Sequence, residues 1–348
     1  RIKLLSQQGK YDFVITEIGG TVGDIESLPF LESIRQLKWE MENNAIVVHL
    51  TYVPYLAAAG ELKTKPTQHS VKDLLQQGVQ PDIIVCRTEH TLTESVRDKI
   101  SLFCNIDRAS VIESIDAPTI YEVPFNMLKE GLDIQVLKKL GISAKGEPDL
   151  EKWKSFLYKL KNPLTEVNIG LVGKYVELKD AYKSISEAFI HAGAATQCKV
   201  KLKWIHSEKI EDNPGMIEEE LKGLNGILVA PGFGTRGIEG KIMAVRYARE
   251  NNIPFLGICL GMQCAVIEFA RNVLGYKDAH SVEMMASTKH PVIDMMEEQK
   301  HLTNMGGTMR LGAYPCKLKA GTKIMEAYQK ELISERHRHR YEFNNAYL

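Results

Sequence analysis

Short β-rich runs alternate with amphipathic helical patterns along almost the whole chain, and this alternation limits the fold more than any other feature. The run at 45–53, AIVVHLTYV, is continuously apolar and β-branched, as expected of a strand buried on both faces. The expected strands are at 11–18, 45–53, 82–86, 110–112, 167–172, 199–205, 226–230 and 253–258, and the expected helices at 28–42, 66–77, 95–103, 180–195, 237–250 and 262–270. Strand, helix and strand in this order form a parallel pair covered by the helix, so an α/β fold is predicted.

The chain is long enough for two domains. Its 348 residues exceed what one core ordinarily serves. Residues 145–163 are rich in charge and carry prolines near both ends, which indicates a linker around a helix. We expect a first domain at 1–144, this linker, and a second domain at 164–348. The chain begins without a methionine and ends without an obvious closing element, and we expect it to be a fragment.

Charge and cysteine usage argue against several classes of protein. Lys+Arg and Asp+Glu both number 44, whereas a dedicated binder of nucleic acid or anionic membranes carries a basic excess. No apolar run reaches the roughly 18 residues that span a bilayer, and no secretory leader opens the chain. The six cysteines include no Cys-x-x-Cys pair, which argues against a zinc framework or a disulfide scaffold. We therefore expect no nucleic-acid or membrane partner, and a reduced, cytoplasmic setting.

The segment Gly257-Ile258-Cys259-Leu260-Gly261 joins an expected strand to an expected helix. A nucleophile elbow requires small residues two before and two after the nucleophile, because that turn is crowded. A thiol at a helix N-terminus is also favoured as the thiolate. The alternative is a purely structural role, in which the cysteine is buried before a helix. The glycine turn at 231–234 closes another strand and can aim backbone N–H groups at a developing oxyanion, so the two features together favour catalysis.

Acidic and basic segments follow the first two expected strands. Glu17 opens a glycine-rich turn at a strand end, where ligands of parallel sheets bind, and a carboxylate there suits Mg²⁺. The segment 63–68, KTKPTQ, combines two lysines and a threonine with a helix N-terminus, which is typical of an anion-binding site. The alternatives are a polar strand end and a solvated basic loop. Together the two segments favour a magnesium–nucleotide site.

The elbow and the glycine turn resemble a class I glutamine amidotransferase domain. In that family the cysteine attacks the side-chain amide of glutamine and ammonia is released. The resemblance implies that Cys259 is the nucleophile and that Gly232 and Leu260 contact the oxyanion and the glutamine through backbone N–H groups. The remaining residues expected to hold glutamine are Gly261, Met262, Gln263, Glu283 and Arg340.

The family's base is a histidine in a His-x-Glu pair downstream of the cysteine, and this sequence has no such pair after Cys259. Its one His-x-Glu, at 206–208, lies upstream of the cysteine and is interpreted as a surface coincidence. The triad is therefore expected to be incomplete in this chain. Cys264 does not match the nucleophile position and is expected in the core.

Eight segments in order resemble the CTP synthase family. They are 17–30, 60–70, 99–105, 170–175, 231–240, 251–263, 306–312 and 335–345. The resemblance implies a P-loop-type amidoligase domain followed by a flavodoxin-like glutaminase domain. It also implies a cytoplasmic C–N ligase of pyrimidine biosynthesis, in which Mg-ATP phosphorylates UTP at O4 and ammonia from glutamine then displaces phosphate to give CTP. The resemblance also implies that GTP activates the enzyme. It implies a homotetramer, with filaments as a further assembly.

The same resemblance assigns the nucleotide sites. Glu17 would be a magnesium ligand. The residues expected to hold UTP or CTP are Asp24, Ile25, Glu26, Lys63, Thr64, Lys65, Pro66, Thr67, Gln68 and Lys99. Those expected near the ATP adenine are Ile115, Asp116 and Ala117, and Phe233 and Arg310 lie in segments associated with GTP.

Parts of the family pattern have no match here. A phosphate-binding glycine loop and a second magnesium-binding carboxylate would precede Arg1, and the His-x-Glu pair would follow Leu348, so the chain alone is expected to be inactive. Two alternatives stay open. One is an amidotransferase joined to a different ATP-dependent ligase, and the other is a catalytically dead, nucleotide-binding regulatory or filament-forming homologue.

Overall fold

The structure is a computed structural model that describes all residues except 1, 8, 297–298 and 300–308. Residues 306–308 of the segment 306–312 therefore lie outside the described residues. The chain divides into two compact units, unit 1 (Arg1–Lys152) and unit 2 (Trp153–Leu348). The division falls inside helix α7 (Glu151–Lys161), within the stretch expected to be a linker. Among the described helices, none combines the length and apolar character that crossing a membrane would need.

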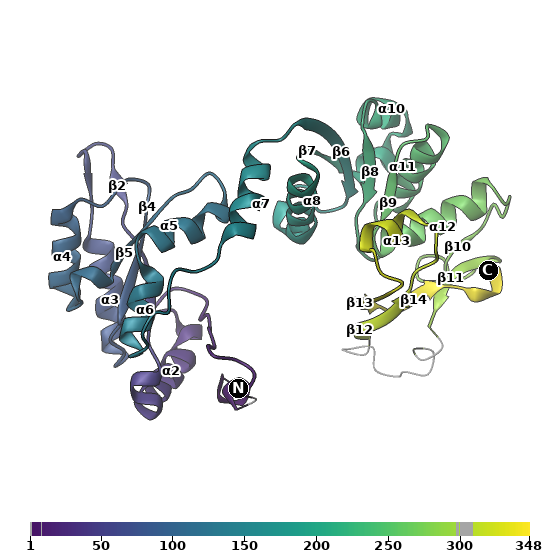
Figure 1. Ribbon diagram of the computed structural model, residues 1–348. Coiled ribbons are helices and arrows are strands. Elements are labelled where there is room, and N and C mark those ends of the chain that lie inside the picture. The colour runs from purple at the N-terminus through teal and green to yellow at the C-terminus, as the bar shows by residue number, and fades with distance from the viewer. Residues whose placement is uncertain (1, 8, 297–298, 300–308) are drawn as a thin grey trace. The chain divides into compact units, whose positions relative to one another are not determined.

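Unit 1 is built on a parallel sheet of three strands, shown in the purple-to-teal part of Figure 1. Its order is β1 (Val48–Tyr52), β4 (Ile83–Thr88), β5 (Val111–Ile115), with β4 in the centre. Helix α3 (Lys65–Gln76) connects the first pair and α4 (Glu94–Cys104) the second. The remaining elements are α1 (Ile2–Ser6), α2 (Leu28–Met41), β2 (Tyr55–Leu56), β3 (Glu61–Leu62), α5 (Val123–Lys129) and α6 (Leu132–Lys139). From the carboxyl end of β1 the chain thus passes through the β2–β3 hairpin into the basic segment.

The apolar face of each helix explains its place. On α3, Val71 and Leu74 are buried at helical spacing, Val71 against Ile84 and Cys86 of the central strand and Leu74 against Leu31 of α2. On α4, Ile100 and Cys104 enter the same core as Val71. The period of the apolar residues therefore decides which helix side meets the sheet. The predicted helices of unit 1 are confirmed, with ends shifted by one residue.

The strand predicted at 11–18 is wrong. These residues have no strand structure, and Ile15 is 95% exposed. Among the described residues, β1 has a hydrogen-bonded neighbour on one side only, and 11–18 do not pair with its other edge. A β-rich composition indicates only that a segment is compatible with a sheet. A strand forms only where a partner strand is present to hydrogen-bond with it. Glu17 therefore does not stand at a strand end.

Unit 2 contains a parallel sheet of four strands, in the teal-to-green part of Figure 1. Its order is β7 (Cys198–His206), β6 (Thr165–Gly173), β8 (Gly226–Val229), β9 (Phe255–Gly257). The connecting helices are α8 (Lys183–Thr196), α9 (Ser207–Asp212), α10 (Ile217–Leu221), α11 (Ile238–Glu250) and α12 (Leu260–Asn272), which continues from β9. Chain order reverses between β6 and β8, the switch point where doubly wound sheets bind ligands. The predicted α/β class is confirmed.

A second part of unit 2 lies beyond α12 and was not predicted. A sheet contains β10 (His280–Ser281), β11 (Pro291–Met295) and β14 (Tyr341–Phe343), and a hairpin pairs β12 (Arg310–Lys317) with β13 (Leu332–His339). Helix α13 (Lys323–Tyr328) lies within the hairpin connection. Both hairpin strands alternate between half-buried and exposed residues, a period of two that could have been read from the sequence. The hairpin brings the chain back to α12.

Candidate active site

Cys259 occupies a strained turn between β9 and α12. Its backbone has φ 54° and ψ −109°, a region that residues with side chains rarely adopt. Three hydrogen bonds fix the turn: Ile258 N–H donates to Val229 O (3.1 Å), Gly261 N–H to Ile258 O (2.9 Å) and Gln263 N–H to Cys259 O (3.2 Å). The thiol is exposed at the N-cap of α12. This is the elbow that the sequence predicted.

The two glycines of the elbow are required by space. A Cβ on Gly257 would lie 2.5 Å from the carbonyl carbon of Gly261, and one on Gly261 would lie 2.1 Å from Val229 O. Both distances are far below ordinary van der Waals contact, and the neighbours are backbone atoms that cannot rotate away. Only glycine at both positions lets the helix start so close to β8. The spacing Gly-x-Cys-x-Gly therefore reports the packing of β8, β9 and α12.

The glycine turn after β8 lies next to the elbow. Ala230 N–H donates to Val172 O (2.9 Å), which extends the sheet by one residue past Val229. A Cβ on Gly232 would lie 3.4 Å from Leu260 Cδ2, so the two residues predicted to supply oxyanion N–H groups are neighbours. The structure thus brings together Cys259, Gly232 and Leu260 at the carboxyl ends of β8 and β9.

Residues predicted to hold glutamine gather beside this turn. Glu283 Oε1 accepts a hydrogen bond from Gly234 N–H (3.2 Å). Gln263, buried on α12, donates through Nε2 to Tyr341 O (3.2 Å). Burial and the nearby Glu283 carboxylate raise the pKa of Tyr341, which places that carboxylate close to β14. The neighbouring Arg340 is 8% exposed at the start of β14. Segments far apart in the chain therefore converge here.

Two lysines that the sequence reasoning missed support the glycine turn. Lys174, just after β6, donates through Nζ to Phe233 O (2.5 Å), and burial lowers its pKa. Lys241 on α11 has no exposed surface and donates through Nζ to Ala230 O (2.8 Å). Burial lowers the pKa of Lys241 to about 8. The sequence did indicate that Lys241 is buried, because its position falls on the same apolar helix face as Ile238 and Ile242.

His206 lies away from the elbow. It ends β7, and β6 and β8 separate β7 from β9 in the sheet. The interpretation of 206–208 as unrelated to Cys259 agrees with this order, but its placement on the surface is wrong, because Ser207 is fully buried. Cys264 is fully buried, and burial raises the pKa of its thiol to about 12, as expected of a core residue.

In unit 1 the basic segment begins α3 after the β2–β3 hairpin. Thr64 is the buried N-cap and accepts a hydrogen bond from Gln68 Nε2 (3.0 Å), and buried Thr67 donates to Tyr52 O (3.2 Å) at the end of β1. Pro66 lies in the first turn of the helix, where its missing N–H costs little. These contacts fix the segment, in which Lys65 is exposed.

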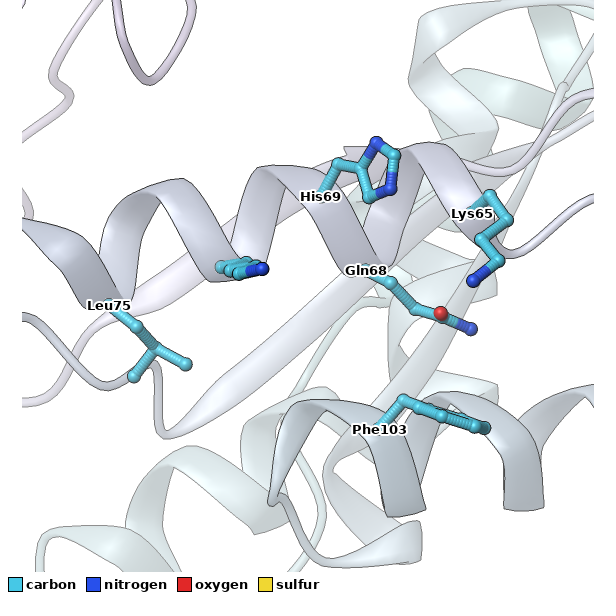
Figure 2. Close-up of a pocket in the computed structure, with 6 residues that line it drawn as sticks. Lys65, Gln68, His69, Leu75 and Phe103 are labelled. Atoms are coloured by element: carbon cyan, nitrogen blue, oxygen red, sulfur yellow. The ribbon is translucent and has the colours of Figure 1, made fainter.

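One of the predicted nucleotide-binding lysines pairs with a carboxylate on which a second acts only at longer range. Lys63 forms an ion pair with Glu61, and Lys63 followed by the more distant Lys99 lowers the pKa of that carboxyl. Lys65 and Gln68 line a shallow pocket of about 230 Å³ with His69, Lys72, Leu75 and Phe103. Figure 2 shows Lys65 and Gln68 projecting from α3 on the side where Phe103 of α4 lies. The structure thus gathers cations at this sheet edge.

The other predicted nucleotide residues lie on separate features. Asp24 accepts a hydrogen bond from Thr21 N–H (3.0 Å) and precedes exposed Ile25 and Glu26. Asp116, between Ile115 and Ala117 after β5, accepts a hydrogen bond from Arg87 Nε (2.9 Å).

No metal centre is complete in the described part of the chain. Within those residues there is no group of three or more His, Cys, Asp or Glu that could hold a metal ion. Exposed Glu17 is one hard oxygen donor, and Mg²⁺ often takes only one or two carboxylates together with substrate phosphates and water. Glu17 therefore suits the role of one ligand to an Mg²⁺ ion that a bound nucleotide also holds. It does not form a metal site by itself.

Comparison with known proteins gives two family matches. Residues 177–348 match the model described as glutamine amidotransferase class-I, and residues 1–142 match CTP synthase N-terminus. CTP synthases of Cytophaga hutchinsonii and Flavobacterium johnsoniae are 68% and 64% identical over the whole of this chain. The chain spans 64% of the length of each. A solved glutaminase domain of Trypanosoma brucei CTPS with bound acivicin is 40% identical, covering 52% of this chain and 69% of its own, with a TM-score of 0.49.

Fold, elbow and family model together define unit 2 as carrying a class I glutamine amidotransferase domain. With the match of unit 1 and the similarity along the full chain, the chain belongs to the CTP synthase family.

Proposed function

We propose that the complete protein, and not this chain alone, hydrolyses glutamine through Cys259 of unit 2. The observation that carries the proposal is the strained backbone of Cys259, held at a helix start beside the Gly232 turn. In the proposed step the thiolate attacks the side-chain amide carbon, a C–S bond forms, and the carbonyl electron pair moves to oxygen. The N–H groups of Gly232 and Leu260 would stabilise that oxygen. The carbonyl then re-forms as the C–N bond breaks, and the leaving nitrogen takes, through the family's histidine base, the proton that the thiol gave up, so that ammonia departs and water hydrolyses the remaining thioester.

We further propose that the Glu283 side of the site holds the polar end of glutamine. Glu283, Gln263 and Arg340 combine a carboxylate, an amide and a guanidinium, the groups that an α-amino acid requires. Gly261 and Met262 lie in the first turn of the helix beside them; the Gly261 N–H is used by Ile258 O, so the Met262 N–H would face the ligand. We assign His206 no part in proton transfer, because it lies across the sheet from Cys259.

For the whole protein we propose ATP-dependent amination of UTP to CTP with this ammonia. The positive charges of Lys63, Lys65 and Lys99 support a binding site for a nucleoside triphosphate. The other residues proposed for UTP or CTP are Asp24, Ile25, Glu26, Thr64, Pro66, Thr67 and Gln68, and Ile115, Asp116 and Ala117 are proposed for ATP. Mg²⁺ would neutralise phosphate charge, with Glu17 among its ligands.

Three further features belong to the proposal. GTP would activate the glutaminase near Phe233, which is 71% exposed, and Arg310, whose guanidinium lies 3.9 Å from the ring centroid of Tyr314. The protein would form a homotetramer or a filament, and it would work in the cytoplasm, where free thiols such as those of the described residues persist.

One experiment separates the two chemistries. In the protein carrying its complete reading frame, CTP formation is measured with glutamine and with free ammonia. Cys259→Ala is expected to abolish only the glutamine route, because ammonia bypasses the thioester. Lys65→Ala is expected to impair both routes at least tenfold, since it weakens binding of UTP phosphates. Equal loss of both activities in both variants would contradict this division of labour.

A further inference from the structure

A lysine is buried beneath the glycine turn. Lys241 is the largest fully buried side chain of the described residues and lies on α11 among core residues such as Ile238, Ile242 and Val245. Removing an ammonium from water is unfavourable unless it gains strong partners. Lys241 Nζ donates a hydrogen bond to Ala230 O (2.8 Å). A packing role alone would be served better by an apolar side chain of similar length.

The ammonium lies directly behind the predicted oxyanion donors. A Cβ on Gly232 would lie 3.6 Å from Lys241 Nζ on one side and 3.4 Å from Leu260 Cδ2 on another. Burial is the largest effect that opposes the charge of Lys241 and Lys174 opposes it further, whereas Cys264 and Cys259 favour it only when they are ionised. The positive charge therefore lies against the backbone that joins β8 to the glycine turn.

The backbone between Ala230 and Gly232 offers few donors. Ala230 N–H is used by Val172 O in the sheet, and Pro231 has no N–H and a fixed φ. Gly232 then carries the first N–H that the sheet does not use. The Gly232 N–H lies in the next peptide group, which is joined to the Ala230 peptide group through the fixed φ and the ψ of Pro231, and Lys241 holds the first of these groups through the Ala230 carbonyl oxygen.

We propose that Lys241 is a positioning residue of the oxyanion pocket, which holds the Ala230 carbonyl so that the Gly232 N–H faces the oxygen that becomes negative during attack by Cys259. The inference rests on the glutaminase function proposed above. Lys241 touches no substrate atom. Its effect is confined to steps in which negative charge develops on that oxygen.

Two reagents distinguish this role from a general effect on the thiol or the fold. The aldehyde 5-oxopentanoate adds reversibly to Cys259: the Sγ–C bond forms, the carbonyl electron pair moves to oxygen, which becomes negative, and the thiol proton goes to solvent. Its oxygen occupies the oxyanion pocket. Iodoacetamide forms an Sγ–C bond with loss of iodide, and no oxyanion develops. The first reaction depends on Gly232, whereas the second does not.

The experiment uses the 348-residue chain at pH 7, below the pKa of about 8 to which burial lowers Lys241. Lys241→Met keeps the length of the side chain and removes the ammonium, and Lys222→Met makes the same change at an exposed lysine. We expect Lys241→Met to weaken the 5-oxopentanoate adduct of Cys259 at least tenfold, a modest part of the loss typical of a deleted oxyanion donor. The iodoacetamide rate at Cys259 should change less than about threefold, and Lys222→Met should change neither.

Three outcomes overturn the inference. They are an unchanged aldehyde affinity in Lys241→Met, a parallel loss of both reactions, and an equal effect of Lys222→Met. If the unsubstituted chain reacts with iodoacetamide at Cys259 but forms no aldehyde adduct, the proposed glutaminase function fails, and this inference with it. If Lys241→Met does not fold, as judged by circular dichroism, Lys241→Gln gives the same comparison with a neutral donor that is too short to hold Ala230 O.

Discussion

Replacement of Gly261 by alanine tests the packing that creates the elbow. Gly261 lies in the first turn of α12, and in an unobstructed helix this substitution stabilises by up to about 1 kcal/mol, because alanine has the higher helix propensity. Here the added Cβ would lie 2.1 Å from Val229 O and 2.9 Å from Val229 C. Propensity and packing therefore predict opposite signs for the same change.

The packing effect should dominate. Val229 ends β8, which is hydrogen-bonded to β6 on one side and to β9 on the other, so it cannot retreat without breaking the sheet. The helix start must move instead by more than an ångström to reach ordinary contact. Overpacking of this kind costs about 3 kcal/mol, which leaves a net loss of about 2 kcal/mol after the gain in propensity. For a domain of this size the expected fall in Tm is about 4–8 °C.

Differential scanning calorimetry of the chain measures the Tm of the unit 2 transition, and the alkylation rate of Cys259 reports the elbow directly. Gly215→Ala is the matched control, because its Cβ would meet only Asn213 Oδ1, at 3.4 Å, and Gly215 has no positive φ. The control should stay within about 0.5 kcal/mol of the unsubstituted chain. A Tm for Gly261→Ala equal to or above that of the unsubstituted chain would refute the argument.

Two further predictions concern titration. Cys259 should react first with a glutamine-like electrophile, because burial raises the thiol pKa of Cys86 and Cys264 to about 12 and that of Cys104 to about 11, so these thiols stay protonated near neutral pH; peptide mapping that found the label mainly on one of them would contradict the elbow assignment. Burial lowers the pKa of Lys241 from 10.5 to about 8, so between these values the unfolded chain binds more protons and stability should rise with pH, by on the order of 3 kcal/mol. Urea unfolding at pH 8 and pH 10.5 should show that rise in the unsubstituted chain relative to Lys241→Met, and an equal pH dependence in both would show that the lysine is not desolvated.

The local sequence was sufficient to predict the structure where one short segment determines both its conformation and its chemistry. Gly257-x-Cys259-x-Gly261 predicted a strained strand-to-helix turn, because only glycine permits such close backbone approach. The buried strands and most helices were likewise predictable, since periods of 2 and 3.6 residues report which faces are covered. The basic segment at the start of α3 was identified for a similar reason, as its proline and threonine suit a helix N-terminus.

Pairing and convergence were decided by the tertiary structure. Residues 11–18 have the composition of a strand but none of its structure, because the ladder depends on a neighbour and not on the segment itself. Glu283 meets Gly234 across 49 positions of sequence, and no local pattern encodes such a contact. From the sequence alone Lys241 is an ordinary lysine on a helix. In the folded structure its ammonium contacts Ala230 O and has no exposed surface. The sequence by itself determined which residues could react, whereas the fold determined which backbone groups and charges surround them, because burial and distance exist only after the chain has packed.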